Sequence, residues 1–339
     1  MIYVNAKYKH QKVTGVQRYT HEILKFWREK NFEFLESEVC SRLTNISEQL
    51  LFTPKDKLLW CPTNTGPILN RNKVVTLHDC AVLFEPSWFS KRYAFLRKLV
   101  IPQLVNSSKG IITVSNFSKS IISESLRVEE KYIKVIPNGI DHQFFNPSLV
   151  GGKSERGLGY FSGKPYFLIV GSLDPRKNIA ITLEAWSKLP KQLSQNFDLV
   201  IVGCHNKNFA KIVHPDAVDL NGVHYLGYVG DEELRELYAN AHAFLFPSMF
   251  EGFGLPVLEA MAMRVPVICS NSSALPEVCG DAVRYIDPTD VDDLIEAIVE
   301  ISSNEALRLK LVKLGVAHCQ KYSWEATAEE TYNYLKDCV

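Results

Sequence analysis

The segment "EGFGLPVLE" carries two acidic residues eight positions apart within an otherwise apolar part of the chain. These residues are Glu251 and Glu259, and between them lie two glycines and a proline, Gly252, Gly254 and Pro256. Carboxylates accept hydrogen bonds from hydroxyl groups, which sugars and ribose offer in pairs. Glycines let the backbone approach a ligand closely. The spacing therefore predicts a sugar site beside a glycine-rich turn.

The elements that flank this turn predict a site for an anion as well. The apolar run 243–248 is typical of a buried strand, and Pro256 suits the first turn of a helix. A helix N-terminus at the end of a strand attracts phosphate through its N–H groups and its dipole. Because carboxylates repel phosphate, Glu251 and Glu259 suit the sugar and the ribose of a nucleoside diphosphate sugar. The alternative for Glu259 is an acid that complements the helix dipole.

A second charged cluster, "VGSLDPRKN", follows another apolar run. Arg176 and Lys177 are adjacent cations at the predicted start of a helix, where they oppose the helix dipole. A bound diphosphate would remove that cost. Since ligands of open parallel sheets bind at the carboxyl ends of strands, this cluster also predicts a ligand site.

Both clusters depend on strands that alternate with helices along the whole chain. Runs of Val, Ile and Leu without alternation indicate strands buried on both faces of a parallel sheet, and the helices between them supply the crossovers. We expect strands at 2–5, 58–62, 74–79, 111–115, 133–139, 166–171, 198–203, 223–227, 243–248, 265–270 and 283–287. Two such series predict an α/β protein with two doubly wound, Rossmann-like domains.

The domain boundaries follow from composition. Segment 151–165 is rich in glycine and serine and has no apolar period, which is typical of a linker. We therefore predict an N-terminal domain over 1–150 and a C-terminal domain over 166–321. The last segment, 322–339, begins with Ser323 as a helix N-cap and continues as an amphipathic helix. We expect this helix to complete the N-terminal domain.

Composition excludes several protein classes. The chain has 339 residues, of which 46% are hydrophobic and 22% charged, as in globular rather than disordered proteins. No run approaches the roughly 18 apolar residues of a membrane span, and the N-terminal residues lack a signal-peptide pattern. The eight cysteines include no C-x-x-C pair, so we expect reduced thiols in a cytoplasmic protein.

Charge is unevenly spread, although the net charge is zero. Residues 1–150 carry 21 Lys and Arg against 13 Asp and Glu, a balance of +8, which leaves 17 against 25, a balance of −8, for 151–339. The asymmetry suggests two domains with different partners, among which we expect no nucleic acid, and the alternative is that charge differs between the halves by chance. Segment 87–105 combines four cations with large apolar residues that include Trp88, Phe89, Tyr93, Leu96, Leu99 and Val100. It is either a basic helix on an anionic membrane or an ordinary crossover helix with a solvated face.

We expect no metal ion. The Asp-x-Asp pair, Asp290 and Asp292, precedes a helical pattern and is typical of a helix cap. Paired cations and a helix N-terminus would serve a leaving diphosphate without a divalent ion.

The segment "EGFGLPVLE" resembles the E-x7-E motif of the family 4 glycosyltransferases, which are retaining enzymes with the two-domain GT-B fold. Further matches cover the chain in order: "TGVQRYTHEIL" (14–24), "LHD" (77–79), "VIPNGID" (135–141) and "VGSLDPRKN" (170–178). The resemblance implies an acceptor-binding N-terminal domain and a nucleotide-sugar-binding C-terminal domain. The active site would lie in the cleft between them, where Glu251 contacts the transferred sugar and Glu259 the ribose. It implies that sugar and phosphate are held by the backbone of Gly252, Phe253, Gly254 and Leu255.

The resemblance implies further roles for charged residues. Lys177 would hold the diphosphate. Many members carry an arginine where this chain has Ser172, and Arg176 would supply that charge. His78 would line the cleft facing the donor sugar, although a lone histidine at a strand end is also typical of a structural residue.

Two loops complete the implied donor site. Gly15 would bring backbone N–H groups to the diphosphate, with a plain turn glycine as the alternative. Tyr228 and Val229 would bind the nucleotide base, with a half-buried loop aromatic as the alternative for Tyr228.

The implied function is transfer of a hexose. The segment "SLDPRKN" resembles mannosyl- and rhamnosyltransferases of bacterial surface polysaccharides, which favours GDP-mannose as donor and a saccharide or lipid-linked saccharide of an O-antigen or capsule as acceptor. No cofactor beyond the donor is expected, and the enzyme would work in the cytoplasm or at the inner face of the membrane. The alternatives are a sugar-nucleotide epimerase of the same fold and a non-catalytic sugar-nucleotide-binding module.

Overall fold

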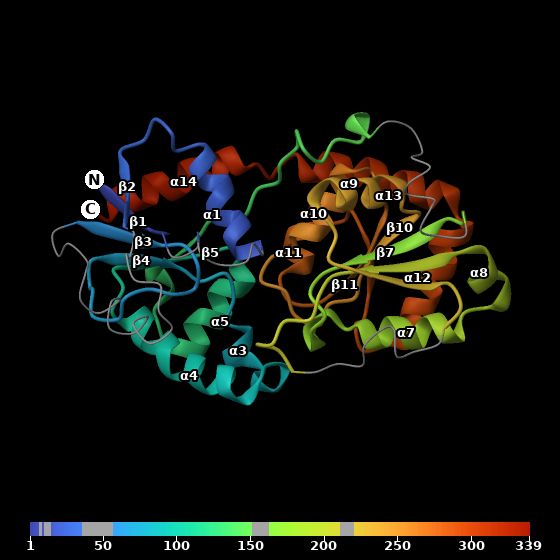
Figure 1. Cartoon of the computed structure of the whole chain (residues 1–339), viewed down its shortest axis with the longest axis horizontal. Helices are drawn as coiled ribbons and strands as arrows, with labels where there is room; N and C mark the ends of the chain where they lie inside the picture. The colour runs from blue at the N-terminus through green and yellow to red at the C-terminus, as the bar shows by residue number, and fades with distance from the viewer. Residues whose placement is uncertain (7–8, 10–14, 36–56, 151–162, 211–219) are drawn as a thin grey trace. The chain divides into compact units, whose positions relative to one another are not determined.

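Figure 1 shows the computed structural model, which describes residues 1–339 except 7–8, 10–14, 36–56, 151–162 and 211–219. The chain divides into two compact units. The N-terminal unit comprises Met1–Pro86, Lys91–Gly139 and Tyr322–Val339, and the C-terminal unit comprises Ser87–Ser90 and Ile140–Lys321. The predicted linker, 151–165, lies outside the described residues apart from its last three positions.

The N-terminal unit is built on a six-stranded sheet in the order β2-β1-β3-β4-β5-β6, with every pair parallel. Its strands are β1 (Ile2–Asn5), β2 (Phe32–Leu35), β3 (Leu58–Cys61), β4 (Lys73–Thr76), β5 (Gly110–Thr113) and β6 (Ile133–Val135). Its helices are α1 (Gly15–Lys25), α3 (Ala81–Phe84), α4 (Lys91–Asn106), α5 (Asn116–Leu126) and α14 (Trp324–Asp337). Strands β3, β4 and β5 are buried throughout, because helices cover both faces of this sheet (Figure 1).

The last helix, α14, packs beside α1 in the N-terminal unit (Figure 1). Its predicted N-cap is confirmed, since the Ser323 hydroxyl accepts a hydrogen bond from Ala326 N. The ring of Trp324 meets Tyr19 edge-on, with centroids 6.0 Å apart. A Cβ at Gly139 would collide with the backbone of Trp324, so glycine is needed there. The chain's last segment therefore contributes to the core of the unit that holds its first strand.

The C-terminal unit repeats this architecture, with six parallel strands in the order β12-β11-β10-β7-β8-β9. The strands are β7 (Tyr166–Val170), β8 (Asp198–Val202), β9 (Val223–Gly227), β10 (Ala243–Phe246), β11 (Val267–Ser270) and β12 (Arg284–Ile286). The helices are α7 (Ile179–Lys188), α8 (Lys191–Asn196), α9 (Asp231–Asn240), α10 (Leu255–Ala262), α11 (Leu275–Cys279), α12 (Val291–Ser303) and α13 (Glu305–Cys319). One large buried cluster joins residues of β7, β8, β10 and β11 to α7 and α12.

The two predicted parallel sheets are confirmed, and each predicted strand run contains an observed strand. Strand β2 was not predicted, because it lies at a sheet edge and interrupts its apolar residues with Glu33. Four runs were predicted two or more residues too long at their carboxyl ends, namely 74–79, 111–115, 133–139 and 243–248. Their apolar residues continue past the ladder because the following loops are partly buried.

The prediction of one helix over 87–105 is wrong at its start. Trp88 ends a 3-10 helix, Pro86–Trp88, and α4 begins only at Lys91. Phe89 is buried and forms an antiparallel bridge with Phe209, which draws Ser87–Ser90 into the C-terminal unit. Aromatic packing thus removes this segment from the helix. Among the described residues, no helix is both long and apolar enough to cross a membrane.

Candidate functional site

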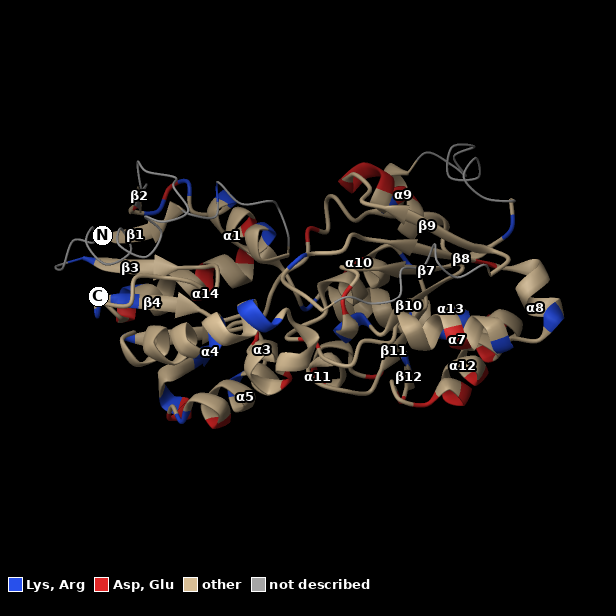
Figure 2. Ribbon diagram, turned by 60° about the horizontal axis from the view of Figure 1, so that its bottom comes forward, with Lys and Arg blue, Asp and Glu red and all other residues tan. Residues whose placement is uncertain are grey.

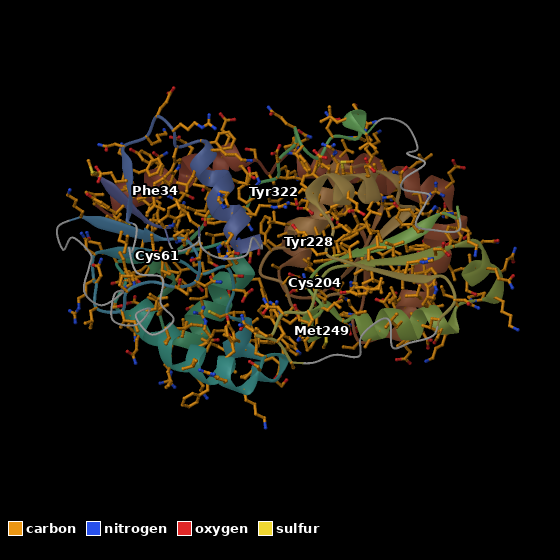
Figure 3. The ribbon with its side chains drawn as sticks, in the orientation of Figure 1. Phe34, Cys61, Cys204, Tyr228, Met249 and Tyr322 are labelled. Carbon is orange, nitrogen blue, oxygen red and sulfur yellow. The ribbon has the colours of Figure 1, made fainter. Side chains whose placement is uncertain are left out.

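Two loops of the C-terminal unit bring the predicted charged clusters together. Strands β7 and β10 are parallel neighbours, so loops 171–178 and 247–254 both leave the sheet at the carboxyl ends of its strands. The two loops are joined by a hydrogen bond from Met249 N to Arg176 O, 2.7 Å long. Figure 3 labels Cys204, Tyr228 and Met249, which follow β8, β9 and β10 and lie at these carboxyl ends. The predicted site therefore lies where neighbouring strands of this sheet have their carboxyl ends.

The glycine-rich turn is shaped by Gly254, which caps α10 with a φ of 108°. This left-handed conformation favours glycine, and a Cβ there would approach Leu275 Cδ2 to 2.7 Å. As the N-cap of α10, Gly254 has no side chain that could accept a hydrogen bond from the first N–H groups of the helix. The first N–H groups of α10, from Leu255 onward, therefore form the kind of helix N-terminus that binds anions.

Lys177 and Glu251 form an ion pair at these strand ends. Lys177 Nζ lies 2.5 Å from Glu251 Oε1, and each side chain is 13% exposed. The same ammonium lies 4.7 Å from the ring centroid of Phe246, the last residue of β10. The two residues that sequence reasoning assigned to the sugar and to the diphosphate thus meet directly.

The backbone around Glu251 is fixed by the loop that follows β11. Glu251 N donates to Ser273 Oγ over 2.9 Å, and Ala274 N donates to Glu251 O over 3.3 Å. These bonds fix the backbone of Glu251, whose carboxylate is held in turn by Lys177. A fixed backbone is what a group that orients a ligand requires.

Asp174 organises the other predicted diphosphate ligands. This fully buried carboxylate accepts hydrogen bonds from Ser172 Oγ over 2.5 Å and from Arg176 Nε over 3.0 Å. It also accepts from Arg176 N as the N-cap of the 3-10 helix Pro175–Lys177. Ser172 and Arg176 are therefore tied to Asp174, and the charge of Arg176 is largely compensated.

The guanidinium of Arg176 also lies against two aromatic rings. Its centre is 4.8 Å from the ring centroid of Phe209 and 5.6 Å from that of Phe89. The side chain is thus fixed by an ion pair and by stacking, which favours a structural part in shaping the loop. Its contact with a diphosphate stays a prediction.

Glu259 lies in the second turn of α10 and not in its first, which weakens its interpretation as a helix-dipole acid. It is 8% exposed, and its Oε2 accepts a hydrogen bond from Tyr238 Oη over 3.0 Å. The carboxylate thus stays beside the glycine-rich turn, with a buried tyrosine as partner.

The predicted base-binding loop follows β9. Tyr228 is 66% exposed and comes directly after Gly227, whereas Val229 is buried. The exposed ring contradicts the interpretation of Tyr228 as a half-buried aromatic and leaves its face accessible for stacking.

In the N-terminal unit, His78 follows β4 and is held on several sides. Its Nε2 lies 3.0 Å from Pro62 O, its backbone N donates to Asn64 Oδ1, and the Tyr19 ring meets it edge-on at 4.6 Å. Burial lowers the pKa of His78 below its ordinary value of 6.5. The ring is therefore neutral at pH 7, and a proton on Nε2 leaves Nδ1 as an acceptor.

Gly15 is the first residue of α1, and a Cβ there would meet no described atom within 4 Å. The preceding residues, 10–14, lie outside the described chain. The roles of Gly15 and His78 in a cleft between the domains therefore stay predictions.

The Asp-x-Asp segment is a helix cap, as predicted. Asp290 Oδ1 accepts from the backbone N of Asp292 and of Asp293 at the start of α12. Within the described parts of the chain, no three His, Cys, Asp or Glu side chains are grouped so that they could hold a metal ion.

Sequence reasoning missed three residues that hold the site together. Asp174 was signalled by its place before Pro175, since Asp-Pro favours a turn whose side chain caps the next backbone N–H. Ser273 and Tyr238 carry no comparable local signal, because their partners lie 22 and 21 positions away.

Comparisons with known proteins identify the family of the chain. The model of the glycosyl transferases group 1 matches residues 153–316, and that of Glycosyltransferase Family 4 matches residues 59–144. The O-antigen chain mannosyltransferase B of Escherichia coli is 32% identical over 285 residues, which are 83% of this chain and 74% of that protein. The O-antigen chain mannosyltransferase RfbU of Salmonella typhimurium is 32% identical over 73% of this chain and 65% of its own length.

Solved structures share the fold of the whole chain. WaaG, a glycosyltransferase involved in lipopolysaccharide biosynthesis, has a TM-score of 0.75 at 17% identity and covers 99% of both chains. Anabaena HepE, solved with UDP and glucose, has a TM-score of 0.77 at 17% identity over 99% of this chain and 98% of that one. The predicted GT-B fold is thereby confirmed. The matched ranges and the Escherichia coli relative show that this chain is an enzyme of the glycosyl transferases group 1, the family 4 glycosyltransferases.

Proposed function

We propose that the chain is a retaining mannosyltransferase that moves mannose from GDP-mannose to a saccharide or lipid-linked saccharide of an O-antigen. The names of two relatives support the sugar and the polymer. The observation that carries the proposal is the ion pair of Lys177 and Glu251, which lies at the ends of two neighbouring strands beside the N-terminus of α10. This is a cation for a diphosphate next to a carboxylate for sugar hydroxyls.

The proposed chemistry follows from these charges. The bond between the sugar and the diphosphate breaks through an oxocarbenium-like transition state. Lys177 and the N–H groups of α10 stabilise the negative charge that grows on the diphosphate. The acceptor hydroxyl attacks from the face that the diphosphate leaves, and a phosphate oxygen takes its proton. The new bond then has the configuration of the old one, and no metal ion or further cofactor is required.

We also propose that α4 holds the enzyme against an anionic membrane at its cytoplasmic face, where a lipid-linked acceptor would lie. Phe95, Leu96 and Leu99 share one side of α4 by their spacing and are 64%, 49% and 51% exposed. Three exposed cations accompany them, Lys91, Arg92 and Lys98. Exposed apolar groups among cations fit an anionic lipid surface better than an ordinary crossover helix.

The test is a transfer assay with GDP-mannose, UDP-glucose and UDP-GlcNAc, each with a lipid-linked saccharide acceptor and with or without EDTA. We expect an α-linked product from GDP-mannose only, formed equally well with EDTA. A β-linked product would refute retention, and a loss that Mn²⁺ restores would refute the metal-free scheme. An epimer formed from UDP-GlcNAc without acceptor would instead identify the epimerase, and binding without any product would identify a binding module.

A further inference from the structure

Tyr238 is a buried tyrosine that no part of the proposed chemistry uses. It lies in α9 and is 0% exposed. Its hydroxyl donates to Glu259 Oε2 over 3.0 Å, whereas the nearby Pro256 O is 3.4 Å away. Because a hydroxyl has one proton to donate and the carboxylate is the closer acceptor, the bond to Glu259 is the stronger one.

The position of this hydroxyl is set by packing. The ring of Tyr238 meets Phe244 edge-on with centroids 5.5 Å apart, and it meets Phe145 edge-on at 6.1 Å. Phe244 lies in β10, the strand that leads into the glycine-rich turn. The phenol is thus fixed against the same element that positions Glu251.

Glu259 needs such a partner. A carboxylate that is 8% exposed has lost most of its water, and a hydrogen-bond donor must offset that loss. A donor in a rigid place also restricts how the carboxylate turns, so that it is ordered before a ligand arrives.

We propose that Tyr238 is a positioning residue that orients the Glu259 carboxylate toward the ribose hydroxyls of the donor. This inference rests on the proposed function, in which Glu259 accepts hydrogen bonds from the ribose. Tyr238 acts through Glu259 and does not touch the donor. Its removal should therefore weaken the recognition of ribose hydroxyls and leave the other contacts of the nucleotide intact.

The test is Tyr238→Phe, which removes the hydroxyl and keeps the ring, in calorimetric titrations with GDP and with 2′,3′-dideoxy-GDP. We expect GDP to bind about tenfold more weakly to the variant and the dideoxy nucleotide to bind almost unchanged. The preference for GDP should therefore shrink. Tyr166→Phe is the matched control, since Tyr166 is buried and its hydroxyl donates to Leu237 O of the same helix over 2.7 Å. It should keep the wild-type preference.

A double variant separates positioning from general loosening. If Tyr238 acts through Glu259, adding Tyr238→Phe to Glu259→Ala should change neither titration further. A wild-type preference in Tyr238→Phe, or equal weakening of both nucleotides, would overturn the inference and leave the proposed function standing. If the wild type binds both nucleotides equally, the ribose role of Glu259 falls and the inference falls with it.

Discussion

In the proposed mechanism, Lys177 stabilises the negative charge that grows on the diphosphate during the reaction. Its ammonium contacts Glu251, which lies four residues before α10 begins. Lys177→Ala should therefore slow single-turnover transfer by about 10²–10³ and weaken donor binding much less. Lys188→Ala is the matched control, because Lys188 pairs with Glu184 on an exposed face of α7 and such pairs contribute little.

Glu251→Gln should give a different pattern, since the amide keeps the shape of the side chain and removes its charge. We expect slow transfer from GDP-mannose with nearly unchanged affinity for GDP, measured by single-turnover kinetics and calorimetry. If both Lys177→Ala and Glu251→Gln transfer mannose at near wild-type rates, the reacting sugar does not lie beside this ion pair.

His78 predicts a pH dependence of stability. Burial lowers its pKa in the folded state below the ordinary value of 6.5, so the unfolded chain binds the proton more readily. The stability that depends on a neutral His78 is fully present above pH 6.5. It is lost as the pH falls from 6.5 through the lower pKa of the folded state. Urea unfolding at pH 7.5 and 5.5 should show a larger loss for the wild type than for His78→Gln. Equal losses would show that the imidazole is not desolvated.

Site residues could be predicted from the sequence where they lie together in one short segment. The glycine turn with Glu251 and Glu259 was recognisable because seven consecutive residues separate the two acids. The ion pair between Lys177 and Glu251 was not, since it joins loops 74 positions apart. The ion pair between Arg176 and Asp174 was not predicted, because the adjacent cations Arg176 and Lys177 suggested a shared role toward the diphosphate.

Among the elements, burial decided what could be predicted. Strands such as β8, which is buried along its length, stand out as continuous apolar runs. The edge strand β2 does not, because Glu33 interrupts it. The start of α4 was missed for another reason, since the bridge of Phe89 with Phe209 depends on a loop 120 positions away that no local pattern reveals.

The surface of α4 predicts salt-dependent membrane binding. The double variant Lys91→Ala/Arg92→Ala should bind vesicles of anionic phospholipid more weakly by about 1 kcal/mol per cation at low salt. Lys310→Ala/Lys313→Ala is the matched control, because both lysines are exposed on α13 of the C-terminal unit. Flotation of both double variants with vesicles measures the difference. Equal binding by both would remove α4 from the membrane contact.

For the molecule as a whole, the charge balance supports the same assignment. The excess of eight positive charges lies in residues 1–150, and an equal negative excess lies in 151–339. Figure 2 shows acidic residues on the first turn of α9 and on α12 in the C-terminal unit. An anionic membrane would repel these helices and attract the basic half. The charge balance therefore favours the basic half, 1–150, for the proposed contact with lipid.

The division into two units predicts how the whole chain unfolds. Trp324 is 4% exposed and packs in the N-terminal unit although it comes 15 residues before the chain's end. Trp324→Ala should therefore destabilise the N-terminal unit by about 3–5 kcal/mol. GDP should stabilise the C-terminal unit by about 2.7 kcal/mol at one hundred times its dissociation constant.

Differential scanning calorimetry with and without GDP separates these two effects. We expect Trp324→Ala to lower a transition that GDP does not move, and GDP to raise a second transition in both proteins by the same amount. Glu330→Ala, an exposed substitution on the same helix, should leave both transitions in place. If Trp324→Ala instead lowers the GDP-dependent transition or abolishes GDP binding, α14 supports the nucleotide site directly. The two units would then fold as one cooperative body, and the last helix would couple the N-terminal unit to the C-terminal unit.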